Sequence, residues 1–186
     1  IIAGTDDWNN ATLDAGGNAA SKKGSYTITG ESVHVTNRAQ NTRFHFGADK
    51  TLVIAKGMTY CASVLYKLNS GTDSLFLQFE TKNSSGAKSY YGNAFKNAKQ
   101  DIELDNGWKL RWAAFTATAD GYADGLFIST ADDNATVAND LTIMHPMVQM
   151  GNAPTAWTAS SGDYLTTTET KTEIKQTVSE IKLTAS

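Results

Sequence analysis

Short apolar runs separated by turn-forming residue pairs occupy most of the chain, and this rhythm predicts strands and not helices. The turn-forming pairs are Gly16-Gly17, Thr29-Gly30, Ser70-Gly71, Ser85-Gly86, Asn106-Gly107, Asp120-Gly121 and Asp124-Gly125. The runs between them predict strands at 25–29, 32–36, 42–46, 51–55, 58–67, 74–80, 88–91, 101–104, 108–118, 122–130 and 141–150. Because no helix is expected among them, an all-β sandwich of two packed antiparallel sheets fits better than an α/β fold.

Alternation of apolar and polar residues supports two of these strands in detail. In 58–67 the even positions, from Met58 to Tyr66, are apolar, and most of the odd positions are polar. In 74–80 the parity is reversed, since Leu75, Leu77 and Phe79 are apolar. Each strand should therefore bury one face. We expect the two strands to pair as an antiparallel hairpin through the loop 68–73.

The amino-acid composition changes near the C-terminus. We therefore divide the chain into a sandwich domain, 1–162, and a linker with the start of a stalk, 163–186. The stalk is rich in Thr, Glu and Lys, and Ile174, Val178 and Ile181 follow one another at spacings of four and three. Such a seam predicts the start of a parallel coiled coil. The alternative is an ordinary amphipathic helix that folds back on the sandwich.

Composition excludes several classes of function. The net charge is -3, and the 16 lysine and arginine residues are scattered, whereas nucleic-acid binding needs a basic stripe. We therefore expect no nucleic-acid partner. No segment has the roughly 18 apolar residues that span a bilayer, so we expect no membrane insertion. The one cysteine, Cys61, lies in an apolar run and is interpreted as a buried filler.

A search for catalytic patterns gives no support for an enzyme. The chain has no Gly-x-Ser-x-Gly, His-Glu-x-x-His, Cys-x-x-Cys or glycine-rich phosphate motif. Only Glu31, Glu80 and Glu103 precede the stalk, so a pair of glutamates for sugar hydrolysis is not expected. No metal cluster is predicted, and the one cofactor considered is a structural calcium held by Asp6 or Asp7 together with Asp140.

Aromatic residues suggest a binding surface. Tyr90 and Tyr91 are neighbours in one predicted strand, so one ring should point inward and the other outward. Trp112 should face away from Ala113 and Phe115 for the same reason. A tryptophan on an outer face of a sheet is often part of a binding site. The other strand aromatics are expected in the core: Phe44, Phe46, Tyr60, Tyr66, Phe79, Trp108 and Phe115.

Flat rings on a rigid sheet can stack against the apolar faces of a sugar while polar side chains bond its hydroxyl groups. Arg43 and His45 alternate with Phe44 and Phe46 and should lie on the polar side of their strand. The predicted saccharide-binding residues are therefore Trp112, Tyr91, Tyr90, Arg43 and His45.

Several segments resemble a known family. They are Gly4-Thr5-Asp6-Asp7-Trp8, Gly57-Met58-Thr59-Tyr60-Cys61-Ala62-Ser63, Gly107-Trp108 with Phe115-Thr116-Ala117, and Met147-Val148-Gln149-Met150-Gly151 with Pro154-Thr155-Ala156-Trp157-Thr158. In order and spacing they resemble the jelly-roll carbohydrate-binding modules of tail and baseplate proteins of phages that infect Gram-positive bacteria. One departure is the pair Gln149-Met150, where family members often carry a glutamate.

The segment 170–177 is similar to the sequence that follows such modules in tail-associated adhesion proteins, where the chain enters a trimeric fibre. The resemblance implies a jelly-roll fold and binding of host cell-wall polysaccharide during adsorption by a homotrimer located in the virion, at the phage tail tip or baseplate. Two rivals stay open: a structural spacer or decoration domain that mediates protein contacts in the virion, and an accessory carbohydrate-binding module of a secreted glycoside hydrolase.

Overall fold

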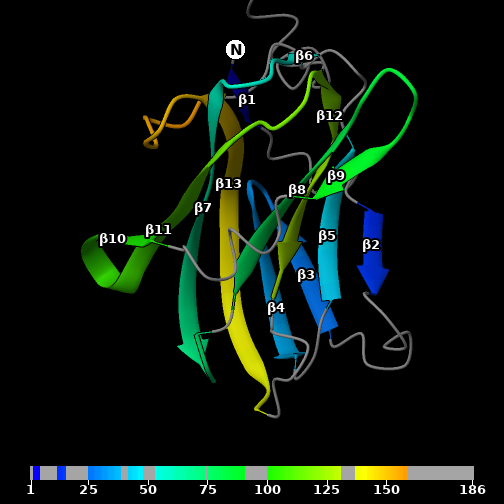
Figure 1. Ribbon diagram of the computed structural model, residues 1–186. Helices are drawn as coiled ribbons and strands as arrows, with labels where there is room; N and C mark the ends of the chain where they lie inside the picture. The colour runs from blue at the N-terminus through cyan, green and yellow to red at the C-terminus, as the bar shows by residue number, and fades with distance from the viewer. Residues whose placement is uncertain are drawn as a thin grey trace, which may run out of the picture.

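The structure is a computed structural model, and it describes the chain in eight segments. These are residues 2–4, 12–15, 25–38, 42–47, 53–73, 75–90, 100–130 and 137–158. Nearly all of these residues lie in strands or in the turns between them (Figure 1). Among the described residues the one helical element is a single 3-10 turn, Asp105–Gly107. The predicted stalk and the boundary at 162/163 lie outside the described residues.

Of the described strands, seven form one antiparallel sheet. In spatial order they are β10 (Gln100–Glu103), β11 (Trp108–Thr116), β7 (Thr59–Ser70), β13 (Asn139–Met150), β4 (Ser32–Arg38) and β3 (Ser25–Thr29), and β1 (Ile2–Gly4) also pairs with β13. β13 carries a bulge between Met144 and Met147. There His145 adopts a left-handed backbone conformation with φ 55°.

The remaining six strands form the second antiparallel sheet. Their order is β2 (Thr12–Ala15), β5 (Thr42–Gly47), β12 (Gly121–Ser129), β8 (Phe76–Lys82) and β9 (Lys88–Tyr90), and β6 (Val53–Ile54) pairs with β12. The strands predicted from the sequence are all present, most of them within two residues of the predicted ends. The exception is β7, which continues three residues beyond its predicted end at 67.

Consecutive strands of the central core lie in opposite sheets, as in a jelly roll. Thus β7 belongs to the seven-stranded sheet and β8 to the six-stranded one, and the same change of sheet separates β4 from β5 and β11 from β12. The predicted hairpin between 58–67 and 74–80 is therefore wrong. Reversed parity and a turn-rich loop fit a crossover between two sheets as well as a hairpin, because both place one face of each strand in the same core.

Apolar side chains from both sheets fill the space between them. The core includes Tyr60, Val64 and Phe115 from one sheet, and Leu77 and Phe79 from the other. The rings of Phe79 and Phe115 meet across the sandwich with centroids 5.2 Å apart. The aromatic core prediction is confirmed for Phe44, Tyr60, Tyr66, Phe79 and Phe115. The side chain of Phe46 lies outside the described residues.

Cys61 is fully buried, which confirms its interpretation as a filler. Burial raises the pKa of its thiol to about 11, because a thiolate loses solvation in apolar surroundings. No helix among the described residues is long and apolar enough to cross a membrane.

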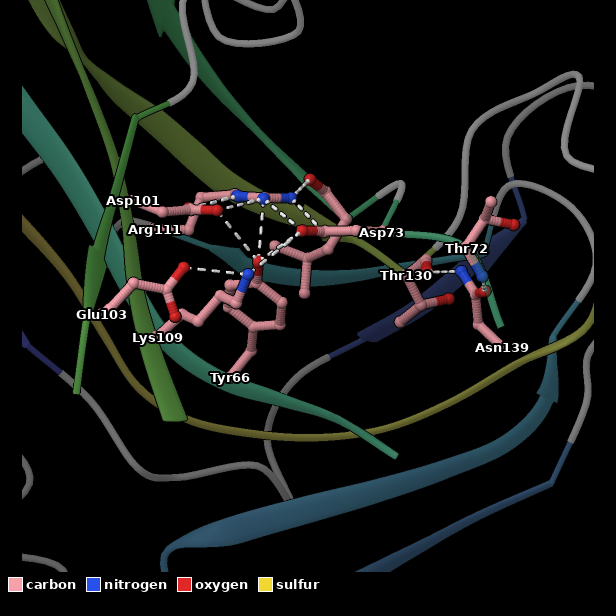
Figure 2. A network of polar contacts seen from close by, with 10 residues as sticks. Tyr66, Thr72, Asp73, Asp101, Glu103, Lys109, Arg111, Thr130 and Asn139 are labelled. Carbon is pink, nitrogen blue, oxygen red and sulfur yellow. Dashed lines mark hydrogen bonds and ion pairs between the residues drawn. The ribbon is translucent and has the colours of Figure 1, made fainter. Parts of the chain in front are cut away.

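A buried arginine joins four parts of the sandwich at one edge. Arg111 of β11 is 2% exposed, and its guanidinium lies between the carboxylates of Asp101 on β10 and Asp73 in the crossover, as Figure 2 shows. Nε and Nη2 donate to Asp101 at 2.8 and 2.6 Å. Nη1 donates to the Leu75 carbonyl at 2.6 Å, and Nη2 donates to the Tyr66 hydroxyl at 2.8 Å. The cluster thus ties β10, β11, β7 and the crossover together.

Candidate functional site

The predicted site residues lie on two sheets. Arg43 and His45 are on β5 and Tyr90 is on β9, all in the six-stranded sheet, whereas Trp112 is on β11 in the other sheet. Tyr91 lies outside the described residues. For Arg43 and Tyr90 the ladder position is described: Arg43 pairs with Ser129, and Tyr90 pairs with Glu80. The prediction therefore divides into two candidate surfaces.

The first surface is the outer side of the six-stranded sheet, which we call the glutamate face: His45, Gln78, Glu80, Lys82, Lys88, Asp124 and Phe127. His45 pairs with Phe127, and Phe127 pairs with Gln78 across the ladder. The His45 ring stacks on the Phe127 ring with centroids 4.0 Å apart and planes 7° apart. As predicted, His45 lies opposite the core residue Phe44. Because Phe127 is 5% exposed, the His45 ring is the one that this pair presents on this side of the sheet.

A connected set of polar groups lies beside this ring pair. Glu80 is 4% exposed, which is rare for a carboxylic acid side chain. Its carboxylate accepts from Gln78 Nε2 at 3.0 Å and from Lys88 Nζ at 3.3 Å. The carboxylate of Asp124 binds Lys82 at 2.6 Å and Lys88 at 3.2 Å. Lys88 thus bridges two carboxylates on one sheet face.

The charged groups of this set shift the pKa values of their neighbours. Hydrogen bonds that Lys88 donates to Asp124 and then to Glu80 raise the pKa of Lys88. For Asp124, burial acts to raise the pKa, but the hydrogen bonds and charges of Lys82 and Lys88 outweigh burial and lower it. Lys88 and Asp124 are therefore held in their charged forms near neutral pH. Sequence reasoning missed Gln78 and Glu80 as site residues, although both alternate with the core residues Leu77 and Phe79.

The second surface is the outer side of the seven-stranded sheet, which we call the tryptophan face: Trp108, Leu110 and Trp112 of β11 with the residues that flank them in the ladder. Ala113 and Phe115 are in the core. Trp112 is half-buried on the other side of β11, which confirms the predicted alternation. Trp108 has the same parity as Trp112 and is also half-buried. Its expected place in the core is therefore wrong.

Polar and apolar side chains flank the two tryptophans in the ladder. Trp112 pairs with Ser63 and Gln100, and Trp108 pairs with Lys67. Between them Leu110 pairs with Leu65 and with Ile102, which is 44% exposed. Two ladder rows thus place an amide and an ammonium group beside the rings, with the Ser63 hydroxyl buried, and the row between them is aliphatic.

The C-terminal described segment packs against the end of the same sheet. Gln149 is 3% exposed. Its Nε2 donates to the Ala153 carbonyl at 2.8 Å, and its Oε1 accepts from the Thr155 hydroxyl at 2.6 Å. The Trp157 ring stacks on His145 at a centroid distance of 4.4 Å. The amide of Gln149 therefore holds the segment 151–158 through hydrogen bonds to Ala153 and Thr155. This gives a structural reason for a glutamine at this position.

Asp140, which the sequence suggested as a calcium ligand, binds two side chains of the protein. Its Oδ1 lies 2.7 Å from His34 Nε2 and accepts from Asn69 Nδ2 at 2.8 Å. The hydrogen bonds from Asn69 and then His34 lower its pKa. Asp6 and Asp7 lie outside the described residues. Within the described part of the chain no group of three His, Cys, Asp or Glu side chains is placed to hold a metal ion.

A scan with models of known families finds no match, and a search of curated proteins finds none either. Among solved structures, a xylan-binding module of family CBM15 superposes with a TM-score of 0.49 at 11% identity, covering 83% of this chain and 99% of that chain. The CBM22-1–GH10 modules of a xylanase 10B from Clostridium thermocellum give 0.43 at 16% identity, with 80% and 26% covered. The active domain of tailspike protein 4 from bacteriophage CBA120 gives 0.41 at 10%, with 81% and 19% covered. The chain thus spans about a quarter of the xylanase chain and a fifth of the tailspike chain.

Proposed function

We propose that the chain is a non-catalytic saccharide-binding module and that the glutamate face is its binding surface. The observation that carries the proposal is the set of polar groups around Lys88, which lies directly beside the stacked His45–Phe127 pair. Two more residues predicted from the sequence, Arg43 and Tyr90, occupy ladder positions in the same sheet.

The chemistry of this face suits a neutral polyol. Asp124 offers acceptor oxygens, and Gln78 and Lys88 offer donors, both of which the buried Glu80 orients. Adjacent hydroxyl groups of a sugar each donate and accept, so they can join such a set without adding net charge. A flat ring beside it can cover the C–H face of the sugar. Because the groups are held in place, little ordering entropy is lost on binding.

The sequence resemblance supplies the context of the proposal. We propose that the module belongs to a phage tail or baseplate protein and binds cell-wall polysaccharide of a Gram-positive host from the virion surface. Assembly through the stalk 163–186 into a homotrimer would present three copies together. Multivalent presentation raises the overall affinity by roughly 10²–10⁴ without new contacts, which would make weak single sites sufficient for adsorption.

The test is a binding screen of the full chain against purified cell-wall polysaccharides from candidate Gram-positive bacteria. We expect Gln78→Ala and His45→Ala to weaken binding about fivefold, since one well-placed hydrogen bond contributes about 1 kcal/mol and tenfold corresponds to about 1.4 kcal/mol. Lys109→Met is the matched control, because it removes an exposed ion pair with Glu103 that belongs to neither face.

Tyr90→Ala and Tyr91→Ala extend the same screen to the predicted tyrosines. All variants are first compared by thermal unfolding, so that loss of binding is separated from loss of fold. The proposed function is wrong if wild type binds no polysaccharide. The assignment to the glutamate face is wrong if wild type binds and the folded Gln78→Ala and His45→Ala proteins bind equally well.

A further inference from the structure

We infer that the tryptophan face is a second saccharide-binding surface, so that one copy of the module holds two glycan segments on opposite sides of the sandwich. The inference rests on the proposed function, and it follows from the way the structure divides the predicted residues. His45 lies outside the core on one sheet, and Trp112 lies outside it on the other. With the whole core between them, these two side chains cannot belong to one site.

The two tryptophans form the apolar part of this surface. Trp108 and Trp112 lie on one side of β11, with Leu110 between them. Four residues of extended strand place their Cα atoms about 13 Å apart. Neither ring is in the core cluster, although Ala113 and Phe115 of the same strand are. Half-buried rings in a row fit a ligand that presents a repeated apolar face.

Polar groups flank both rings at ladder positions. Gln100 is exposed beside Trp112, and Lys67 lies beside Trp108, whereas Ser63 on the other side of Trp112 is 3% exposed and is not available to a ligand. Beyond Lys67 the same ladder row continues through Thr142 to His34. Asp140 binds both His34 and Asn69 and so fixes the His34 side chain at the end of this row. The surface thus offers hydroxyl, amide, imidazole and ammonium groups next to rings, which is the combination that a neutral sugar chain needs.

The length of the row selects the class of ligand. A single sugar is too small to cover two rings about 13 Å apart, so contact with both requires an extended oligosaccharide that runs along β11. The aliphatic pair Leu110 and Leu65 lies between the rings, and it would meet the C–H groups of the central sugar. An extended chain with unsubstituted ring faces therefore fits this surface better than a compact or terminal sugar.

Arg111 makes the row rigid from the other side of the strand. It directly precedes Trp112, and its partner Asp101 lies between Gln100 and Ile102 on β10. Its guanidinium has acceptors for all of its N–H groups within the cluster, namely Asp101, Asp73, the Leu75 carbonyl and the Tyr66 hydroxyl. Arg111 is therefore a positioning residue and not a ligand contact. A strand fixed in this way loses little freedom when a ligand binds.

The test is the number of oligosaccharides bound per chain. Hexasaccharides are prepared from the polysaccharide that wild type binds, and they are titrated into the full chain by calorimetry, with tryptophan emission recorded in parallel. We expect two tight sites per chain for wild type and one each for Trp112→Ala and Gln78→Ala, in which the other site is weakened or lost. Trp112→Phe, which keeps a ring, should retain two sites. Met58→Ala is the control, because Met58 is exposed but lies in the turn before β7, outside both faces.

Each other outcome points elsewhere. One site per chain that is lost in Gln78→Ala and unchanged in Trp112→Ala overturns the second surface and leaves the proposed function intact. One site that is lost only in Trp112→Ala overturns the two-face arrangement and also the assignment to the glutamate face. If Trp112→Ala changes the oligomeric state and not the number of bound hexasaccharides, the tryptophan face is a protein interface and the inference is overturned. Absence of any bound saccharide overturns both proposals.

Discussion

Arg111→Met tests whether the buried cluster stabilises the sandwich. Methionine keeps most of the aliphatic stem and removes the guanidinium, so Asp73, Asp101 and the Leu75 carbonyl lose their shared donor. Removing one partner of a buried ion pair costs about 3–5 kcal/mol, because the remaining charge is left without compensation. The side chains of Asp73 and Asp101 are 33% and 22% exposed, so water can reach them in part. We therefore expect a loss of about 3 kcal/mol at pH 7.

The pH dependence of this loss has a definite sign. In wild type, burial acts to raise the pKa of Asp101, but hydrogen bonds and charge from Arg111 outweigh burial and hold the pKa below its ordinary 3.8. The stability that this carboxylate contributes is therefore present above pH 3.8 and is lost only below it. In Arg111→Met burial is no longer outweighed, so the pKa of Asp101 should rise. Folding then takes up a proton, and the variant should regain stability as pH falls from 7 toward 4.

The assay is urea unfolding followed by tryptophan fluorescence at pH 7 and pH 4. The difference between wild type and variant should shrink by about 1.4 kcal/mol for each unit by which the pKa of the variant Asp101 exceeds 4. Glu103→Gln is the control on the neighbouring strand β10, since its exposed pair with Lys109 should contribute about 0–1 kcal/mol. A loss under 1 kcal/mol, or a loss that is equal at both pH values, would refute the reasoning.

Two further predictions concern buried positions. Because Cys61 is fully buried and its pKa is raised to about 11, a thiol reagent at neutral pH should label it only as fast as the protein unfolds; rapid labelling of the folded protein would contradict this. Gly71 and Gly86 both have positive φ, but a Cβ on Gly71 would meet the Ala138 carbonyl and the Asn139 side chain, whereas one on Gly86 meets nothing. Gly86→Ala should cost about 1–2 kcal/mol and Gly71→Ala clearly more in urea unfolding, and equal losses would show that space at Gly71 is not limiting.

Local pattern in the sequence was sufficient to place most strands. The segments 25–29 and 32–36 coincide with β3 and most of β4, and the predicted turn at Asn106-Gly107 joins β10 to β11. Alternation also gives the correct side for residues within a strand, as for Trp112 against Phe115. Both properties depend on neighbours in the chain, so the sequence carries them directly.

Long-range polar contacts were not predictable in the same way. Arg111 alternates with Ala113 and Phe115 and therefore lies on the inner side of β11, where a charged residue is not expected from pattern alone. Its partners Asp73 and Asp101 are 38 and 10 residues away in sequence. Only the crossover from β7 to β8 and the β10–β11 pairing bring the three together. Because such a cluster depends on topology, no local signal identifies it.

The division of the predicted site has the same origin. Parity assigns a side chain to the core or to the outside, but in a two-sheet sandwich each sheet has its own outside, and parity does not distinguish them. His45 and Trp112 were both correctly expected to face away from core residues, yet they lie on opposite sides of the molecule because β5 and β11 belong to different sheets. The wrongly predicted hairpin between β7 and β8 has the same cause, because parity could not show that these two strands belong to different sheets. A change of sheet between consecutive strands is therefore what turns one predicted surface into two, and counting the bound glycans decides whether both are used.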